Sequence, residues 1–338
     1  MLCIKETQRK MSEYRVLIIG CGQLGSRHLQ AVAALSLVMD IDVVDPSPAA
    51  LSLGQERLLQ VADRNPSHRV RWLSKVEDAT PGGDLCIVAT QAAGRPALVE
   101  QVAAMGYRAF LLEKIVTQSA AQYRDLLSLA DARGLSVWVN CQERTYPFHQ
   151  AVRARIEPSE PVVFTSVGGN HGLACNGVHL ADLFAFYTGA QEIQSAGAHV
   201  DSQLHASRRG ASVYDLSGSL HGYTTNGSQM TVVFAGDHHA PYQITIATRH
   251  ARWVVDYVNQ WAWESRKENS WTWTPVRFEG ELRVSYTTRQ FATEILTKHK
   301  CSLPTLAEAF TAHRFILDEL QPHFNRLLGA ELKYCPVT

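Results

Sequence analysis

Residues 16–25 read VLIIGCGQLG, and residues 41–45 read IDVVD. Both runs are rich in aliphatic and β-branched residues, which predicts two buried strands of a parallel sheet. Three glycines with the spacing GxGxxG follow the first strand, and an aspartate ends the second. Strand, glycine turn, helix, second strand and terminal acid together predict a dinucleotide-binding βαβ unit, whereas the glycine spacing alone is a weak signal.

Each glycine of this turn has a separate physical task. Gly20 turns the chain sharply out of the strand, and Gly22 lets the backbone approach a pyrophosphate. Gly25 allows the following helix to pack closely. We expect that helix over residues 23–35, where its unpaired N-terminal amides and its dipole favour the two phosphates.

Asp45, at the end of the second strand, determines the expected cofactor. A carboxylate at this position accepts hydrogen bonds from both adenosine ribose hydroxyls and repels a 2′-phosphate. No arginine follows among Pro46, Ser47 and Pro48. NAD is therefore favoured over NADP.

The composition argues against several classes of partner. The 32 basic and 32 acidic residues are spread along the 338 positions, which argues against a nucleic-acid partner. No apolar run approaches membrane-spanning length, so we expect no membrane partner. The seven cysteines form no CxxC pair, and residues 1–14 lack the apolar core of a signal peptide. Isolated thiols of this kind indicate a reducing compartment, and we expect a cytoplasmic protein.

Strand and helix patterns alternate as far as residue 141, which predicts a doubly wound parallel α/β sheet. We expect a flexible leader at residues 1–13, with Met11 as an alternative start, and a Rossmann domain at residues 14–141. Alternating segments follow in residues 142–338. They predict an α+β domain for substrate binding and oligomerisation, with a large, mostly antiparallel, open-faced sheet.

Five of the seven tryptophans lie between residues 253 and 273. Aromatic crowding on strands indicates either a packed core or the interface of a homodimer or homotetramer. A platform for stacking sugar rings is the weaker alternative.

A helix is expected near the C-terminal end of the chain. Thr305 is its predicted N-cap, and Glu308 stands three residues further on, which is the spacing of a capping box. The apolar pattern continues from there to Leu320, which predicts an amphipathic helix.

Three further segments are informative in combination with the glycine turn: GQLGSRH at residues 22–28, LEK at residues 112–114 and CNGVHLADL at residues 175–183. Together they resemble the Gfo/Idh/MocA family of NAD(P)-dependent sugar and polyol oxidoreductases. LEK is similar to the family's Glu-Lys-Pro signature, with Ile115 in place of proline. CNGVHLADL is similar to the family's Asp-x-Gly-x-His-x-x-Asp segment, and the resemblance covers residues 14–320.

The resemblance implies three catalytic residues. The family's motif lysine corresponds to Lys114, whose ammonium would stabilise negative charge that develops on a substrate oxygen. The family's histidine corresponds to His179, whose imidazole would take and return the hydroxyl proton. Cys175 stands where the family has its catalytic aspartate, so it is either a substitute acid or a mark of lost activity.

The glycine motif and the resemblance also imply residues that contact the ligands. Cofactor contacts are expected from Gly20, Gly22, Gln23, Leu24, Gly25, Asp45, Thr90 and Glu113. Substrate contacts are expected from Arg95, Asn140, Arg144 and Asn176. For Arg95, an ordinary surface position is the alternative.

A metal site has a weaker basis. His171, Cys175 and His179 are spaced four residues apart, so a continuous helix would align three possible zinc ligands. Gly172 and Gly177 favour a loop at this point instead. We therefore expect no metal.

The resemblance implies an NAD(H)-dependent oxidoreductase that transfers a hydride between nicotinamide and a secondary alcohol or ketone. The expected substrate is a sugar, a nucleotide sugar or a cyclic polyol, bound outside the carboxyl ends of the Rossmann strands. Two alternatives stay open, namely a non-catalytic NAD and sugar sensor or regulatory protein, and a reductase of an imine or an unsaturated ring. Cys175 supports the sensor, whereas the presence of both Lys114 and His179 opposes it.

Overall fold

The computed structural model describes residues 13–207, 210, 212–278 and 282–338, so nearly all of the expected leader lies outside the described residues. The chain divides into two compact units. The first unit contains the chain up to Thr90, together with Gln101–Leu111 and Leu282–Cys301. The second unit contains Gln91–Glu100, Leu112–Glu281 and Ser302–Thr338.

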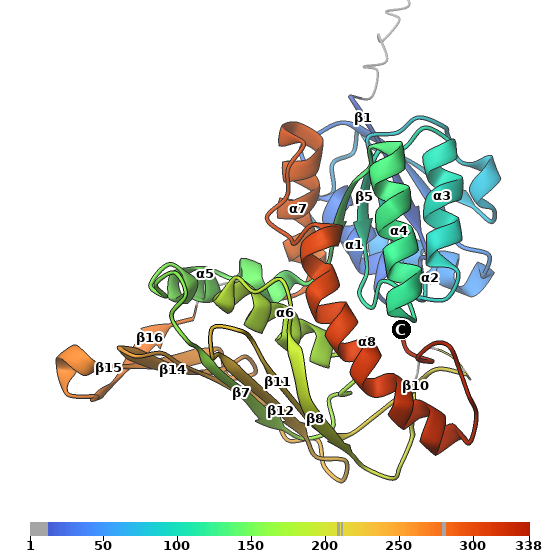
Figure 1. Ribbon diagram of the computed structural model, residues 1–338. Coiled ribbons are helices and arrows are strands. Elements are labelled where there is room, and N and C mark those ends of the chain that lie inside the picture. The colour runs from blue at the N-terminus through green and yellow to red at the C-terminus, as the bar shows by residue number, and fades with distance from the viewer. Residues whose placement is uncertain (1–12, 208–209, 211, 279–281) are drawn as a thin grey trace, which may run out of the picture. The chain divides into compact units, whose positions relative to one another are not determined.

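The first sheet has six strands in the order β3-β2-β1-β4-β5-β6, which is the Rossmann order. Two of its strands, β1 and β5, are labelled in Figure 1. Its strands are β1 (Tyr14–Ile19), β2 (Met39–Val44), β3 (Arg69–Leu73), β4 (Leu85–Val88), β5 (Ala109–Leu112) and β6 (Ser136–Val139). β1 pairs in parallel with both β2 and β4. The last four residues of β1 are buried, as expected for a strand that is covered on both faces. The predicted doubly wound parallel sheet is confirmed.

Helices follow the strands of this sheet. They are α1 (Gly25–Ala33), α2 (Pro48–Leu59), α3 (Arg95–Ala104) and α4 (Ala120–Arg133). α1 begins two residues later and ends two residues earlier than predicted. α4 begins after Ser119, whose hydroxyl accepts a hydrogen bond from the amide of Gln122, and it ends at Gly134 with φ +59°. A left-handed backbone at that position favours glycine.

α7 (Val284–Lys298) groups with the first unit, although the sequence analysis assigned residues 142–338 to the second domain. It packs on α1, where Nδ1 of the buried His28 lies 2.9 Å from the hydroxyl of Thr288. The apolar face of α7 predicts burial but does not specify which element covers it, and that partner is 260 positions away.

The second sheet has eight strands in the order β16-β15-β14-β13-β7-β12-β11-β8. They are β7 (Val163–Gly168), β8 (Gln194–Val200), β11 (Gly218–Tyr223), β12 (Gln229–Phe234), β13 (Gln243–Ala247), β14 (Ala251–Asp256), β15 (Trp261–Arg266) and β16 (Trp273–Arg277). Every neighbouring pair is antiparallel except β7 and β12. The predicted large, mostly antiparallel sheet is confirmed. A separate two-stranded pair consists of β9 (His205–Ala206) and β10 (Tyr214–Asp215).

Side chains alternate between the two faces of the large sheet. Phe164 of β7 is fully buried, whereas Val163 and Val167 on the same strand are exposed. Trp263 and Trp273 are also partly exposed, and the guanidinium of Arg252 lies 4.6 Å from the ring centroid of Trp273. The tryptophan-rich region therefore contributes to the surface as well as to the core, where Trp253 is buried.

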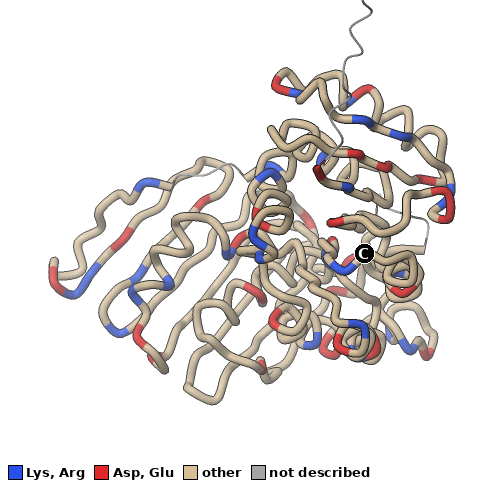
Figure 2. Tube along the Cα trace, turned by 90° about the horizontal axis from the view of Figure 1, so that it is seen from above, with Lys and Arg blue, Asp and Glu red and all other residues tan. Residues whose placement is uncertain are grey.

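The remaining helices of the second unit are α5 (Pro147–Arg153), α6 (Gly177–Thr188) and α8 (Leu306–Leu328), and α6 packs on α8. The capping box predicted for α8 is present: the hydroxyl of Thr305 accepts from the amide of Glu308, and Oε2 of Glu308 accepts from the amide of Thr305. No helix among the described residues is both long and apolar enough to cross a membrane. Basic and acidic residues are interspersed along the trace (Figure 2).

Candidate functional site

Of the three glycines in the turn after β1, one has free space at its Cβ position and two do not. Gly20 has φ +86°, and a Cβ atom on it would lie 2.9 Å from the carbonyl group of Ala89. A Cβ atom on Gly25 would lie 1.7 Å from the carbonyl oxygen of Gly20, whereas one on Gly22 would meet no atom within 4 Å. Packing inside the protein thus requires glycine at the first and third positions. The second position faces open space, which fits a bound pyrophosphate.

Asp45 follows β2 and is held beside this turn. Its carboxylate accepts hydrogen bonds from the amide of Cys21 at 2.7 Å and from the amide of Ser47 at 2.8 Å. An ionised carboxylate has about four acceptor positions, so two stay available for ribose hydroxyls. Thr90 stands two residues beyond β4, and its amide nitrogen lies 3.0 Å from the Cβ position of Gly20.

Arg57 is a neighbour of the glycine turn that the sequence analysis did not identify. It belongs to α2, and its Nη1 donates to the carbonyl of Gln23 at 2.8 Å and to the hydroxyl of Ser26 at 2.7 Å. Leu24, next to Gln23, occupies the N-cap position of α1. The positive charge of Arg57 therefore lies at the turn. No local pattern predicts this contact, since Arg57 and Gln23 are 34 positions apart.

Three of the expected site residues are in contact with one another: Lys114, Cys175 and Asn176, here named the Lys114 cluster. Lys114 follows β5 by two positions and is only 6% exposed. Its Nζ donates to the carbonyl of Cys175 at 3.1 Å, to Sγ of Cys175 at 3.2 Å and to Oδ1 of Asn176 at 3.1 Å. All three hydrogens of the ammonium group therefore have an acceptor within the second unit.

Arg95 supports the loop that carries Lys114. Its side chain is 1% exposed, and Nη1 donates to the carbonyls of Glu113, Ile115 and Val116. Arg95 is therefore not a surface residue, and these contacts hold the backbone on both sides of Lys114. The sequence analysis placed Arg95 at the substrate, because an isolated arginine gives no sign of where its guanidinium will be buried.

Glu113 and Asn140 lie together behind the same loop. Oε1 of Glu113 accepts from Nδ2 of Asn140 at 2.6 Å, and both side chains are buried. The amide of Asn140 also donates to the carbonyl of Leu112 at 2.9 Å. Glu113, which was expected to contact the cofactor, and Asn140, which was expected to contact the substrate, are thus hydrogen-bonded to each other.

Arg144 forms a buried ion pair with α6. Its Nε and Nη2 bind the two carboxylate oxygens of Asp182 at 2.8 and 2.6 Å. This two-point geometry is the strong form of an arginine–carboxylate contact. Asp182 comes from the family-like segment at residues 175–183, so Arg144 fixes the helix that begins there.

His179 lies in the first turn of α6 and is half-buried. The amide of His179 donates to the carbonyl of Asn176 at 3.0 Å, which connects it to the Lys114 cluster through the backbone. α6 begins at Gly177, and Gly172 has φ +86°. The continuous helix that a zinc site on His171, Cys175 and His179 would need is therefore absent here. No cluster of metal-ligating side chains occurs among the described residues.

Asp215 is a site residue that the sequence analysis missed. Its carboxylate accepts hydrogen bonds from the amides of Ala174 at 2.8 Å, Cys175 at 3.3 Å and Leu216 at 2.8 Å. Burial raises the pKa of Asp215, although these amides and the charge of Lys114 oppose that shift. Asp215 fixes the turn that presents Cys175 to Lys114. It lies 40 positions from Cys175, and no motif surrounds it.

Glu143 was also missed, although its neighbours Asn140 and Arg144 were identified. Its carboxyl group is buried and accepts from the hydroxyl of Tyr257 at 3.1 Å and from that of Tyr242 at 3.4 Å. Burial raises the pKa of Glu143 to about 7, against the opposing effects of the tyrosine hydrogen bonds and of the Lys114 charge. A carboxyl group with this pKa gains and loses a proton near neutral pH.

Glu143 continues into a buried chain of polar groups. The hydroxyl of Tyr257 also contacts Nε2 of His149, and Nδ1 of His149 contacts the hydroxyl of Tyr187. Burial lowers the pKa of His149 to about 3, so its ring is neutral, with one nitrogen donating and the other accepting. When Tyr257 donates to Glu143, its oxygen accepts from His149, which in turn accepts from Tyr187. In this arrangement all the hydrogen bonds of the chain point toward Glu143.

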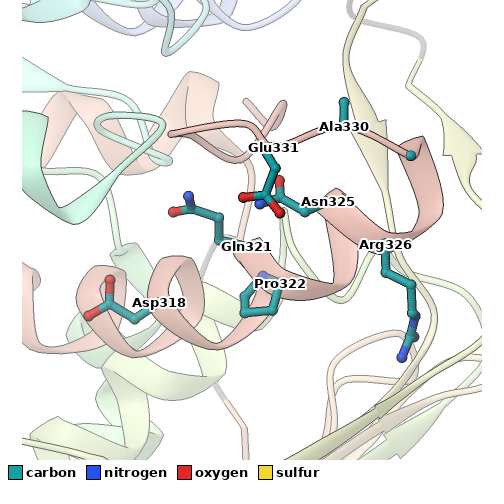
Figure 3. Close-up of a pocket in the computed structure, with 8 residues that line it drawn as sticks. Asp318, Gln321, Pro322, Asn325, Arg326, Ala330 and Glu331 are labelled. Atoms are coloured by element: carbon teal, nitrogen blue, oxygen red, sulfur yellow. The ribbon is translucent and has the colours of Figure 1, made fainter.

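Two cavities of the second unit lie away from the Lys114 cluster. A pocket of about 680 Å³ lies at the C-terminal end of α8, where Asp318, Arg326 and Glu331 are among the lining residues (Figure 3). A smaller one of about 250 Å³ lies beside Arg144. The first is lined by none of the expected site residues, and its charged groups do not converge on one point.

Comparison with known proteins gives one family match. Residues 14–141 match the model of the oxidoreductase family with an NAD-binding Rossmann fold, Gfo/Idh/MocA. No match was found among curated proteins.

Several solved structures share the fold. An oxidoreductase from Agrobacterium radiobacter in complex with NAD+, L-tartaric acid and magnesium is 16% identical, covers 90% of this chain and 94% of its own, and has a TM-score of 0.70. UDP-N-acetylglucosamine 3-dehydrogenase GnnA from Acidithiobacillus ferrooxidans is 17% identical, with 96% and 98% covered and a TM-score of 0.69. The 3-ketoreductase KijD10 from Actinomadura kijaniata, in complex with NADP and TDP-benzene, is 16% identical, with 90% and 96% covered and a TM-score of 0.68. At these identities the likeness shows the fold alone.

The match over residues 14–141 confirms the resemblance found in the sequence: the dinucleotide-binding region of this chain belongs to the Gfo/Idh/MocA oxidoreductase family.

Proposed function

We propose that this protein is an NAD(H)-dependent oxidoreductase that transfers a hydride between nicotinamide and a secondary alcohol or ketone. Its substrate is a sugar, a nucleotide sugar or a cyclic polyol. The observation that carries the proposal is the buried ammonium of Lys114 in contact with Cys175 and Asn176. The structural likeness to a UDP-N-acetylglucosamine dehydrogenase and to a 3-ketoreductase agrees with this substrate class.

The glycine turn and Asp45 are the residues that would hold the cofactor. The open position at Gly22 supports this assignment, because an amide there approaches a phosphate without obstruction from a side chain. When bound, NAD accepts or supplies the hydride. Asp45 favours NAD, whereas the charge of Arg57 at Gln23 would suit a phosphorylated ribose.

Lys114 acts on the substrate oxygen. A substrate hydroxyl or carbonyl replaces one of the three acceptors of its ammonium, and the positive charge then stabilises the negative charge that develops on oxygen. His179 takes the hydroxyl proton during oxidation and returns it during reduction. Cys175 keeps the position of the family's aspartate and supplies a thiol where the relatives supply a carboxylate.

A non-catalytic NAD and sugar sensor is the second candidate. It is favoured by the saturation of the Lys114 ammonium, whose three hydrogens are bound by acceptors of the protein itself. The third candidate, a reductase of an imine or an unsaturated ring, uses the same lysine as a proton donor. Measurement of turnover separates the sensor from both enzymes.

We also propose a homodimer or homotetramer that forms through the open face of the large sheet. The exposed Val163, Val167 and Trp263 support this interface, because exposed apolar and aromatic groups on one sheet face are typical of contacts between subunits. The cysteines of the described residues form no disulfide bond, which supports a cytoplasmic location.

Substitution of Gly22 by alanine should affect NAD binding, whereas substitution of Gly25 by alanine should affect folding. Gly22→Ala should fold with an unchanged melting temperature and lose most of its affinity for NAD, because the new methyl group enters only the open position. Gly25→Ala should lower the melting temperature itself, because its methyl group would collide with the carbonyl of Gly20. Thermal melting and NAD titration by calorimetry measure both effects. Normal NAD affinity in Gly22→Ala would contradict the assigned cofactor site.

Lys114→Ala should lower kcat by at least about a hundredfold, because it removes the group that stabilises charge on the substrate oxygen. Its affinity for NAD should change little. Steady-state kinetics at the nicotinamide absorbance band and calorimetry are the two measurements, with Lys75→Ala on the surface of the first unit as the control. Equal loss of NAD binding and turnover would indicate a damaged fold, and normal turnover would exclude Lys114 from catalysis.

The raised pKa of Glu143 predicts a pH-dependent difference in stability between the protein and its Glu143→Gln variant. Burial raises this pKa from 4.5 to about 7, so the buried carboxyl group is stable when protonated and is destabilised as it ionises. The free energy of unfolding of the native protein should therefore fall relative to that of the variant as pH rises from 4.5 to 7. The slope should be at most about 1.4 kcal/mol per pH unit. Urea unfolding at several pH values measures it, and parallel curves would refute the assignment.

A further inference from the structure

After α8 the chain turns back at Gly329, which has φ +63°. The returning segment is tied to the helix at Leu332, whose amide donates to Oδ1 of Asn325 at 3.1 Å. The carbonyl of Leu332 accepts from Nε2 of Gln321 at 2.8 Å and from Nδ2 of Asn325 at 3.3 Å. Figure 3 shows these two amide side chains on the part of α8 that lies next to Ala330 and Glu331.

The four residues that follow, here named the terminal strap (residues 335–338), are all buried. Cys335 and Val337 are each 1% exposed and Thr338 is 4% exposed, whereas Tyr334 just before them is 40% exposed. A short segment outside any helix or strand is normally exposed, because its backbone groups need hydrogen-bond partners. The terminal strap can therefore be buried only where hydrogen-bond partners for its backbone groups are in place.

That site consists of backbone and side-chain partners from separate parts of the second unit. The amide of Cys335 donates to the carbonyl of Gln118 at 2.7 Å, and Nε2 of Gln118 donates to the carbonyl of Val337 at 3.1 Å. The amide of Tyr214 donates to the carbonyl of Pro336 at 2.8 Å, and the amide of Ala92 donates to the hydroxyl of Thr338 at 2.8 Å. These hydrogen bonds fix the position of the terminal strap along its full length.

The end of the terminal strap lies at the Lys114 cluster. Sγ of Cys175 donates to the backbone oxygen of Thr338 at 3.1 Å and accepts from Nζ of Lys114 at 3.2 Å. The thiol therefore lies between the ammonium and the strap, and Thr338 occupies space beside the group that stands in the position of the family's aspartate. A molecule that reaches the thiol of Cys175 from this side must first meet Thr338.

We propose that the terminal strap is a wall of the substrate site that controls access to Cys175 and Lys114 and thereby limits the size of the substrate. This inference rests on the proposed function only because that function names the substrate that passes the strap. The wall itself follows from the hydrogen bonds of Thr338 and from the burial of the strap. It also assigns substrate selection to residues far from the motif at residues 175–183.

The test is the rate at which iodoacetamide modifies Cys175 in the folded protein. In a variant that ends at Cys335, and so lacks residues 336–338, Cys175 should react at least tenfold faster than in the native chain. Peptide mass mapping identifies the modified cysteine. Cys301, which is half-exposed and belongs to the first unit, is the internal reference, and its rate should not change. Lys333→Ala, an exposed change just before the strap, should leave the Cys175 rate unaltered.

A second variant keeps the chain length. Gln118→Ala removes the side-chain donor to Val337 and should raise the Cys175 rate by about fivefold, which corresponds to the loss of one hydrogen bond. An unchanged Cys175 rate in either variant, with melting behaviour that shows a folded protein, overturns the proposal.

Neither readout depends on hydride transfer. Alkylation that responds to the strap in a protein without NAD-dependent turnover would support the wall and refute the proposed function. Turnover without any response of Cys175 would do the reverse. In an active enzyme, loss of the strap should lower KM for larger substrates more than it changes kcat, whereas a general loss of structure would lower kcat for all of them.

Discussion

The buried ammonium group of Lys114 is the central charge of the candidate site, and the polar groups in contact with it act as its hydrogen-bond acceptors. A charge taken out of water is costly unless several acceptors surround it. Lys114 has three, all supplied by Cys175 and Asn176. Both sides of the contact between Lys114 and Cys175 are themselves fixed, since Arg95 holds the backbone around the lysine and Asp215 holds the turn at the cysteine. The geometry of the cluster is therefore set before any ligand arrives, which is what electrostatic stabilisation of a developing charge requires.

Hydrogen bonds of Cys175 connect the Lys114 cluster to the rest of the second unit. The thiol of Cys175 can receive a hydrogen from Lys114 and give its own to Thr338, so a cysteine joins two elements where an ionised aspartate could only accept. Burial raises the pKa of Glu143 against the opposing charge of Lys114, and Glu143 lies at the end of a chain of buried tyrosine and histidine groups.

The parts of this account that the sequence predicts are those that depend on local chemistry. The glycine turn, the strand before it and the capping box at Thr305 each need particular residues within a few positions of one another, and each was located correctly. The resemblance also singled out Lys114 and Cys175 from two separate segments, and the structure brings these two residues into contact. It missed Asp215 and Glu143, and it did not foresee the buried position of Arg95. These residues act through partners tens of positions away, and a lone carboxylate or guanidinium carries no periodic signal of its burial.

The proposed oxidoreductase reaction needs both the Lys114 cluster and the glycine turn. Its most direct test is an absorbance screen at the nicotinamide band, with NAD(H) and NADP(H) against sugars, nucleotide sugars and inositols, preceded by calorimetric titration of each dinucleotide. The account predicts binding of NAD(H) and turnover with at least one member of the panel. Tight binding without turnover would contradict the enzyme and favour the sensor, and absence of any dinucleotide binding would contradict both.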